Sequence, residues 1–245
     1  MRILLTNDDG IEGAGLWALA RALKNFEVVI AAPMRQQSGM AHAMTVWRKM
    51  EYRRLDSEFE AWAIDGTPTD CVKIYMEALA AAKVDAVISG INDGANLATD
   101  VLYSGTVGAA LEGFLHDIPA LAVSRDIRSE ISFDEAAEVT AKYFTERLNS
   151  GEIFFHNVNF PKRYRAGFAE FKFARLGRRD YVNAFVRSEI DGRKYFEIRG
   201  EIVDLDKSEG TDIFAAESGY VSVTPLHVDV THHEKILADD RGRLI

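Results

Sequence analysis

Short apolar runs alternate with helical patterns from residue 1 to about 125, and this alternation limits the possible folds more than any other feature. Apolar runs at 3–5, 27–31, 84–89 and 120–123 predict strands. Helical patterns near 13–24, 69–81, 104–116 and 132–149 lie between or after them. Strands that alternate with helices pair in parallel, and continuous apolar runs are typical of strands covered on both faces. We therefore expect an α/β protein with a doubly wound, mostly parallel sheet.

The pattern changes after about residue 150. Segments 168–176, 181–190 and 194–199 alternate apolar and polar residues, which is typical of antiparallel strands or an extended arm. The pair Asp191-Gly192 predicts a hairpin turn between the last two. A strand is expected at 220–224 and a short closing helix at 232–238. Because the sequence contains no internal repeat and no low-complexity linker, residues 1–245 are expected to form a single domain.

Composition narrows the classes of partner. The 245 residues carry 29 Lys and Arg against 38 Asp and Glu, a net charge of -9, without a basic run. This disfavours nucleic-acid polymers and anionic membrane surfaces as partners. No apolar stretch approaches the roughly 18 residues that span a membrane. Cys71 is the single cysteine, which excludes an intrachain disulfide. The N-terminus lacks a signal-peptide pattern, so we expect a cytoplasmic protein.

Two adjacent carboxylates, Asp8 and Asp9, follow the first apolar run, in the string Thr6-Asn7-Asp8-Asp9-Gly10. They are expected at the carboxyl end of a parallel strand, where open α/β sheets bind ligands. Adjacent like charges resist removal from water, and a hard divalent cation relieves that cost. A solvated turn or a helix cap is the alternative interpretation.

Other predicted strand ends supply further oxygen donors. Asn92, in the string Ser89 to Asn96, offers a carboxamide oxygen, although a flexible surface loop also explains this string. Ser38, after the second strand, offers a hydroxyl group, which alone is a weak signal. Ser104 and Thr106 flank Gly105 at a predicted helix start, where backbone N–H groups and hydroxyls form an anion site. Simple capping of that helix by Ser104 is the alternative.

Several well-known motifs are absent from the sequence. The glycines of segment 10–15 have the wrong order for a dinucleotide fingerprint, and no P-loop string occurs. Asp65-Gly66-Thr67 resembles a phosphatase nucleophile loop, but Ala63 stands where that chemistry needs an aspartate. We interpret this string as a helix start, with Thr67 as the N-cap and Asp70 at N3. None of the six histidines stands at metal-ligand spacing.

In combination, the strings resemble one family, the SurE survival-protein nucleotidases. The likeness spans roughly residues 1–231, with one departure at Ala98, where a glycine is expected. The matching strings, individually modest but highly specific in this order, are Asn7-Asp8-Asp9-Gly10, Gln37-Ser38-Gly39, Gly66-Thr67-Pro68 through Val72, Ser89-Gly90-Ile91-Asn92 with Gly94 and Asn96, Tyr103-Ser104-Gly105-Thr106-Val107, and Thr224-Pro225-Leu226 with Asp229 and Thr231.

The resemblance implies a Rossmann-like α/β fold with an extended antiparallel arm and a C-terminal segment swapped between subunits. The core would then comprise about 1–160, the arm about 165–200 and the C-terminal segment about 201–245. The family resemblance also implies a homodimer or a dimer of dimers.

The resemblance further implies the chemistry. Asp8, Asp9, Ser38 and Asn92 would be the ligands of one divalent metal ion per subunit, and all-oxygen ligation favours Mg²⁺ or Mn²⁺ over Zn²⁺. Asp8 or Asp9 would also orient or deprotonate the attacking water. The phosphate would be bound by four residues, namely Asn96, Ser104, Gly105 and Thr106.

The predicted activity is hydrolysis of nucleoside 5′-monophosphates, and of 3′-monophosphates, to nucleoside and phosphate. Three alternatives remain open at this point. One is a non-catalytic nucleotide- or phosphate-binding module on the same sheet. Another is a short-chain polyphosphate hydrolase. The last is a metal-dependent glycosyl or phosphoryl transferase, which would form products other than orthophosphate.

Overall fold

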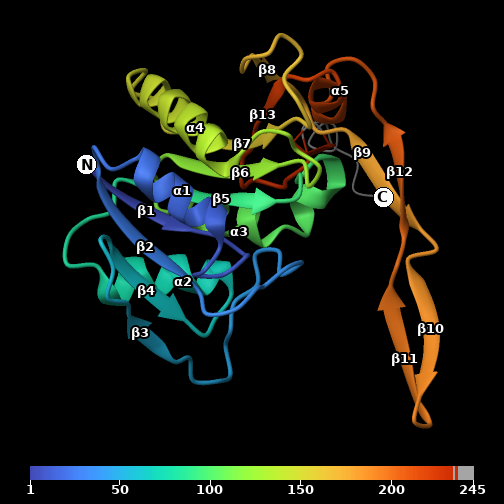
Figure 1. Ribbon diagram of the computed structural model, residues 1–245, viewed down its shortest axis with the longest axis horizontal. Coiled ribbons are helices and arrows are strands. Elements are labelled where there is room, and N and C mark those ends of the chain that lie inside the picture. Colours follow the sequence, from blue (N-terminus) through green and yellow to red (C-terminus); the bar gives the residue numbers. More distant parts are fainter. Residues whose placement is uncertain (234, 237–245) are drawn as a thin grey trace.

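A nine-stranded sheet runs through the computed structural model, which describes residues 1–233, 235 and 236 (Figure 1). Its strand order is β3-β4-β2-β1-β5-β6-β7-β13-β8. The strands from β4 to β7 in this order are parallel, β3 runs antiparallel on β4, and β13 runs antiparallel on β7. The bounds are β1 Arg2–Thr6, β2 Glu27–Pro33, β3 Tyr52–Arg54, β4 Glu60–Ile64, β5 Ala86–Asp93, β6 Ala120–Arg125, β7 Phe155–Phe160, β8 Phe171–Phe173 and β13 Val221–Pro225.

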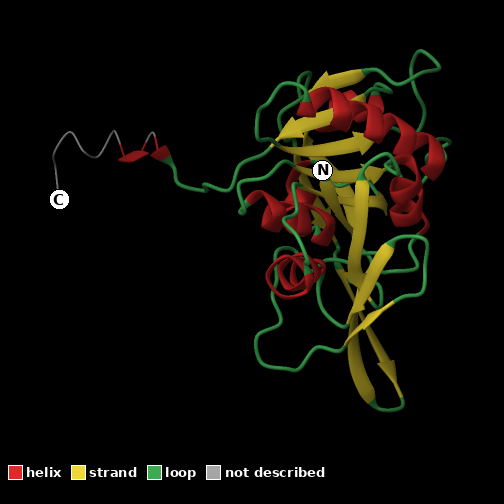
Figure 2. Ribbon diagram, turned by 90° about the vertical axis from the view of Figure 1, so that its left-hand side faces the viewer, coloured by secondary structure: helices red, strands yellow, loops and turns green. Residues whose placement is uncertain are grey.

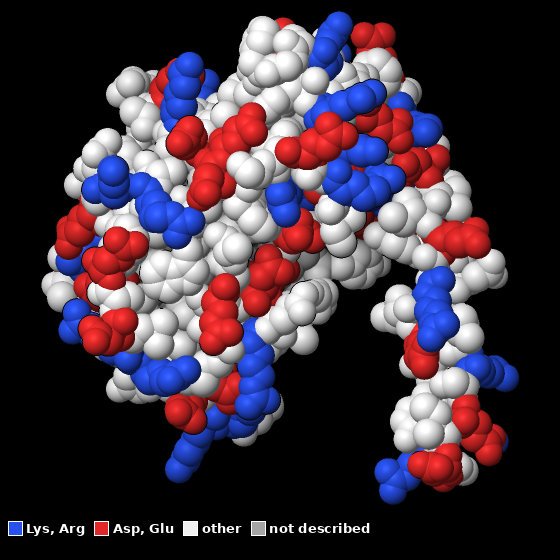
Figure 3. Space-filling view, viewed as in Figure 1, with Lys and Arg blue, Asp and Glu red and all other residues white. Residues whose placement is uncertain are grey.

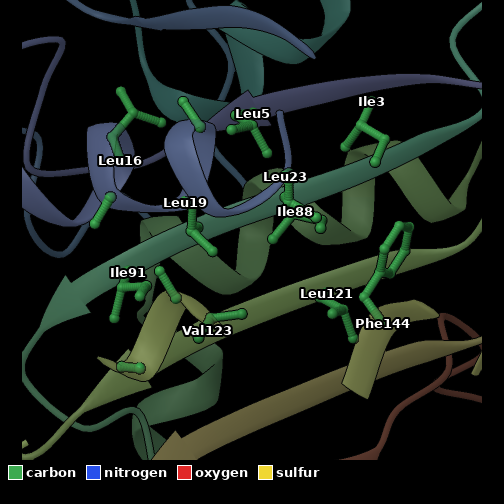
Figure 4. Close-up of a cluster of buried hydrophobic side chains, with 14 of the residues drawn as sticks. Ile3, Leu5, Leu16, Leu19, Leu23, Ile88, Ile91, Leu121, Val123 and Phe144 are labelled. Carbon is green, nitrogen blue, oxygen red and sulfur yellow. The ribbon is translucent and has the colours of Figure 1, made fainter. Parts of the chain in front are cut away.

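Helices cover both faces of this sheet, which confirms the predicted Rossmann-like, doubly wound α/β fold. On one face, α1 (Ala14–Ala22) packs against α4 (Phe133–Leu148), and Leu16, Leu19 and Phe144 meet the strand side chains there (Figure 4). On the other face, α2 (Pro68–Ile74) packs against α3 (Gly105–Phe114). Full burial of one leucine side chain stabilises the fold by about 2 kcal/mol.

The sheet changes winding direction between β1 and β5. From β1 the chain moves to β2 and then β4 on one side, and it returns to β5 on the other side of β1. In open α/β sheets, ligands bind in the crevice outside the carboxyl ends of the strands at such a switch point. The loop after β1, which carries Asp8 and Asp9, and the carboxyl end of β5, which carries Asn92, both lie at this crevice.

Several elements differ from the sequence expectation. The helix expected at 69–81 is shorter, because α2 ends at Ile74 and a π-helical turn, Tyr75–Leu79, follows it. Strand β8 pairs parallel with β13, although the alternating pattern favoured antiparallel pairing. Strands β4 and β7 were not predicted at all. The capping box at the start of α2 is confirmed, with Thr67 Oγ1 accepting from the Asp70 N–H at 3.0 Å.

A long antiparallel arm projects from the body of the molecule (Figures 1 and 2). Its base pairs β9 (Arg178–Val182) with β12 (Glu201–Asp206), and its tip pairs β10 (Phe185–Ile190) with β11 (Arg193–Ile198). The Asp191-Gly192 turn is confirmed, with φ values of 50° and 73° that suit a two-residue hairpin. The arm strands thus occupy 178–206, whereas β8 joins the main sheet.

The chain returns from the arm through α5 (Asp212–Glu217) to β13, which lies inside the sheet. Of the helix expected at 232–238, residues 233, 235 and 236 are helical, and residues 234, 237 and 238 lie outside the described residues. Within the described part of the chain, none of the helices has the length and hydropathy needed to cross a membrane.

Candidate active site at the ends of β1 and β5

The loop after β1 is closed by its own asparagine. Asn7 Nδ2 donates to the Gly10 carbonyl at 2.9 Å, and the Gly10 N–H donates to Asn7 Oδ1 at 3.2 Å. Gly10 has φ of 95°, a conformation that a side chain disfavours. This tight turn places Asp8 and Asp9 in succession at the mouth of the crevice.

Asp8 is a buried carboxylate held against the start of α3. Its side chain accepts a hydrogen bond from Thr106 Oγ1 at 2.7 Å, and the residue is 5% exposed. Burial raises the pKa of Asp8 to about 6; the Thr106 hydrogen bond opposes this rise and the charge of Asp9 adds to it. A Cβ atom on Gly105 would lie only 3.3 Å from Asp8 Oδ2, so glycine permits this close approach.

Asp9, in the loop after β1, lies beside Asp93, the last residue of β5. Burial raises the pKa of Asp9, and a hydrogen bond from the Asp93 backbone N–H opposes that rise. The Asp93 side chain itself pairs with Arg125, with Oδ1 3.0 Å from Nε. The Arg125 guanidinium lies 3.7 Å above the ring of Phe133, which fixes its position. A third carboxylate, Asp93, therefore lies near Asp8 and Asp9, but it is already paired with the Arg125 guanidinium.

The other two predicted ligands come from the carboxyl end of β5 and from the loop after β2. Asn92 Nδ2 donates to the Gly94 carbonyl at 2.7 Å, so the carboxamide oxygen is the atom that Asn92 can offer to a cation. Next to Ser38, the Gln37 N–H donates to the Asp8 carbonyl at 2.7 Å, which joins the exposed Ser38 loop to the β1 loop. The structure thus brings the segments that carry all four predicted ligands to one crevice.

Asn96 lies in a separate amide cluster above β6 and β7. Its Nδ2 donates to Ser124 Oγ at 2.8 Å, and its N–H donates to Asn159 Oδ1 at 2.8 Å. Its carbonyl accepts from Asn157 Nδ2 at 2.8 Å and from Asn159 Nδ2 at 3.1 Å. These contacts hold the loop between Asn92 and η2 (Ala98–Leu102), a 3₁₀ turn that leads to α3. The role of Asn96 as a phosphate contact stays a prediction.

A polar row beneath α3 was not singled out from the sequence. Thr6, Ser89, Asn157 and Thr224 lie at one level of β1, β5, β7 and β13, with Ala122 of β6 between the second and third. All four are buried, and within the described residues each has a side-chain oxygen without a hydrogen-bond partner. Thr6 and Ser89 stand at the polar ends of apolar runs, which was the available signal, whereas Asn157 lies in the middle of β7 and had none.

The four predicted ligands, Asp8, Asp9, Ser38 and Asn92, suit a hard divalent cation. Two partly desolvated carboxylates, a hydroxyl and a carboxamide supply only oxygen donors, which Mg²⁺ and Mn²⁺ prefer. A cation also favours the charged form of the two carboxylates, whose pKa burial raises. In the described part of the chain, no three His, Cys, Asp or Glu side chains converge as metal ligands. A site here is therefore of the mixed-donor kind.

A large, mostly apolar cavity of about 900 Å³ lies beside the start of α3. Ser104 and Val107 of α3 form one wall, residues 41–43 another, and residues 224–230 a third. Ser104 is the N-cap of α3, since its Oγ accepts from the Val107 N–H at 3.1 Å. The cavity thus adjoins the helix start that the sequence predicts as the anion site.

Comparison with known proteins tests the family resemblance. A sequence model of the family described as "Survival protein SurE" matches residues 3–183. The chain belongs to the SurE family. A protein of Thermoanaerobacter sp. (strain X514) named 5′-nucleotidase SurE is 38% identical over 244 residues, which cover 96% of each chain. One of Pelotomaculum thermopropionicum with the same name is 43% identical over 243 residues, covering 96% of this chain and 92% of its own.

The fold agrees with that of a solved SurE protein. The crystal structure of the SurE protein from Aquifex aeolicus matches with a TM-score of 0.82 and 38% sequence identity, over 98% of this chain and 99% of that chain. The resemblance inferred from the motifs is therefore confirmed. The SurE family model ends at residue 183, before the arm tip formed by β10 and β11.

Proposed function

We propose that this SurE chain is a metal-dependent 5′-nucleotidase that hydrolyses nucleoside 5′-monophosphates, and 3′-monophosphates, to nucleoside and phosphate. The observation that carries the proposal is the contact between the Asp8 carboxylate and the N-terminus of α3, through Thr106 and Gly105. This contact places a cation-binding carboxylate next to an anion-binding helix start, which is the arrangement that a metal-assisted phosphate ester hydrolysis needs. Relatives at 38% and 43% identity that bear the 5′-nucleotidase name support it.

Asp8, Asp9, Ser38 and Asn92 would hold one Mg²⁺ or Mn²⁺ per subunit. When bound, the ion supplies positive charge that stabilises the transition state and polarises the attacking water. Around it, the chain positions the phosphate and the water. Accepting or directing the proton of that water falls to Asp8 or Asp9 in this proposal.

The start of α3 would bind the phosphate through different atoms of its three residues. The Thr106 hydroxyl donates to Asp8, and the Thr106 backbone N–H also interacts with that carboxylate, so an anion here would share this N–H with Asp8. Ser104 accepts from the Val107 N–H, which leaves the Ser104 hydroxyl proton to donate to a phosphate oxygen. Gly105 contributes a first-turn N–H and admits the phosphate closely, because it has no side chain. Asn96 completes the proposed phosphate set.

The substrate would be a small molecule whose apolar part lies in the cavity beside Ser104. A volume of about 900 Å³ with mostly apolar walls suits a base and sugar. Lys, Arg, Asp and Glu are interspersed over the face in Figure 3, in keeping with the net charge of -9. A substrate held by local donors, with no nucleic-acid polymer or membrane as partner, fits this surface.

The arm and the C-terminal segment support a homodimer or a dimer of dimers. Phe185, Phe196 and Ile198 near the arm tip are 65%, 66% and 79% exposed, which is unusual for an isolated subunit. After β13 the chain leaves the body (Figure 2), and Val230 is 97% exposed. A second copy of this chain would cover these apolar side chains, with the C-terminal segments exchanged.

A phosphate-release panel tests the function. The purified protein is assayed with 5′- and 3′-nucleoside monophosphates, sugar phosphates and short polyphosphates, each with Mg²⁺, Mn²⁺ or EDTA. We expect release from the nucleoside monophosphates with either metal and none with EDTA. Binding of AMP without phosphate release under any divalent metal would instead indicate a binding module, and preference for polyphosphate would indicate a polyphosphate hydrolase.

A further inference from the structure

The loop that carries Ser38, residues 34–45, has little burial to hold it in place. It contains no helix or strand, and Ser38 at its centre is exposed. Its position therefore depends on a few tethers. Two backbone tethers are the Gln37 N–H to the Asp8 carbonyl at 2.7 Å and the Ala41 N–H to the Tyr103 carbonyl at 3.0 Å. A loop of this kind opens easily when a tether is removed.

The N-terminus of α2 holds the far end of this loop. Thr67 Oγ1 donates to the Ala43 carbonyl at 2.7 Å, and the Thr45 N–H donates to Asp70 Oδ1 at 3.0 Å. Thr67 and Asp70 also form the capping box of α2. The same two side chains thus begin the helix and fix residues 43–45, so this end of the loop is secured independently of Ser38.

The middle of the loop is bound to α3 through His42 and Glu112. Glu112 is 4% exposed, and its Oε2 lies 2.8 Å from His42 Nε2. Its Oε1 lies 3.2 Å from Lys73 Nζ on α2 and 3.7 Å from Nε2 of His116, which lies just after α3. The hydrogen bond with His42 and the nearby Lys73 hold the pKa of Glu112 below its usual range against the effect of burial. Glu112 is therefore a charged, buried anchor for the loop.

Gly108, one turn before Glu112, lets the loop backbone lie directly on α3. A Cβ atom at Gly108 would come within 2.2 Å of the Ala41 carbonyl oxygen and 3.0 Å of His42 Cα. The backbone of residues 41 and 42 thus packs against Gly108, and the side chain of His42 binds the Glu112 carboxylate one turn further along the helix. The same helix begins at Gly105 and Thr106, which contact Asp8.

We propose that Glu112, through His42, is a positioning residue for the loop that carries Ser38, which the Gln37 N–H joins to the Asp8 carbonyl. One helix then sets both sides of the site, since its first turn contacts Asp8 and its third turn holds the loop that carries Ser38. The inference rests on the proposed function only for the role of Ser38 as a metal ligand. The grip of Glu112 on the loop is a separate claim with its own measurement.

Hydrogen exchange measures the grip without any activity assay. In Glu112→Gln and His42→Ala, we expect the amides of Gln37 and Ala41 to exchange about tenfold faster, the size of effect that loss of a charged hydrogen bond produces. His42→Gln keeps a side-chain N–H donor and should exchange at close to the parent rate. Gly108→Ala should speed exchange by pushing the loop away.

Two variants separate this role from simple stabilisation of the helix pair. Lys73→Met breaks the tie between α2 and α3, and it should lower the melting temperature without faster loop exchange. Glu77→Gln removes the other carboxylate bound to Lys73, at 2.8 Å, and does not touch the loop; it should leave both measurements unchanged. If Lys73→Met accelerates hydrogen exchange in the loop as much as His42→Ala does, the inference is contradicted.

Affinity for Mn²⁺, measured from the electron paramagnetic resonance signal of the free ion, links the grip to the site. We expect His42→Ala and Glu112→Gln to weaken Mn²⁺ binding about tenfold, and Ser38→Ala to weaken it at least as much. If Ser38→Ala weakens binding and the other two do not, the positioning role is wrong and the proposed metal site stands. If Ser38→Ala has no effect, its role as a ligand fails, and the positioning claim fails with it.

Discussion

Acidification should destabilise this protein through one buried histidine, His156 in β7. Its residue is 6% exposed, Nδ1 lies 2.8 Å from the Tyr143 hydroxyl, and its ring stacks on Phe154 at 4.9 Å. Burial, with a smaller contribution from Arg147, lowers the pKa of His156 from 6.5 to about 4. The folded state therefore keeps the imidazole neutral at a pH where the unfolded chain binds a proton.

The direction and size of this effect on the free energy of unfolding follow from the difference between the folded and unfolded pKa of His156. This stability is fully present above the unfolded pKa near 6.5 and is lost as the pH falls toward the folded pKa near 4. Each unit of pKa shift corresponds to about 1.4 kcal/mol. Between pH 7.5 and pH 4.5, His156 should thus remove about 2.5 kcal/mol from the free energy of unfolding.

Urea unfolding of the parent and of His156→Gln over this pH range measures the effect. Glutamine does not titrate there, and it can still accept a hydrogen bond from the Tyr143 hydroxyl. The variant should be less stable than the parent at pH 7.5, and the difference should narrow by about 2.5 kcal/mol by pH 4.5. A difference that stays constant across the range would refute the reasoning.

Two further predictions concern the segment between the site and the arm. Ala98 has φ of 54°, and its N–H donates to Asp212 Oδ2 at 2.7 Å, which fixes the backbone in this conformation. Because glycine adopts a positive φ without strain, Ala98→Gly should raise the free energy of unfolding by about 0.5–1 kcal/mol. Ala95→Gly is the control, and it should lower the free energy of unfolding because Ala95 does not have a positive φ. Arg179 binds Asp100 at 2.9 Å and Asp204 at 2.7 Å while 11% of its side chain is exposed. Arg179→Met should cost about 3 kcal/mol in urea unfolding, because two carboxylates lose their partner, and a cost near zero would contradict this account.

Local sequence was enough to predict the strands that carry the site. The segments Ile3-Leu4-Leu5 and Ala86-Val87-Ile88 are apolar, and polar residues and a glycine follow each of them. The position of each strand, and the sheet edge at which it ends, could therefore be predicted. The capping box of Thr67 and Asp70 was also predictable, because its residues lie within one helical turn of each other. In each case the signal lies within a few residues of the element it describes.

Strands β4 and β7 could not be predicted, because distant contacts make their polar residues acceptable. In β4, Glu60 is bound by the Tyr75 hydroxyl at 3.0 Å and by Trp62 Nε1 at 3.1 Å. In β7, Asn157 and Asn159 donate to the carbonyl of Asn96, more than 60 residues earlier. Without these partners, a central strand that contains two asparagines resembles a loop.

The site shows the same division. Asp8, Asp9, Asn92 and Ser104 stand at the ends of predicted elements and were identified as oxygen donors from the residues. Ser38 is a weak candidate from the residues alone, because its place depends on the contact between Gln37 and Asp8. The positioning role proposed for Glu112 depends on His42, 70 residues away, and no local pattern indicates it.

The central claim is that Asp8 and Asp9 bind the metal on which phosphate release depends. Its most direct test compares Asp8→Asn and Asp9→Asn with Asp93→Asn, a matched loss of charge at a carboxylate held by Arg125. Phosphate release from AMP and Mn²⁺ binding are measured with melting temperature as the control for folding. We predict that Asp8→Asn and Asp9→Asn lose both phosphate release and Mn²⁺ binding while remaining folded, and that Asp93→Asn keeps both. Unchanged turnover in both Asp8→Asn and Asp9→Asn would contradict the account.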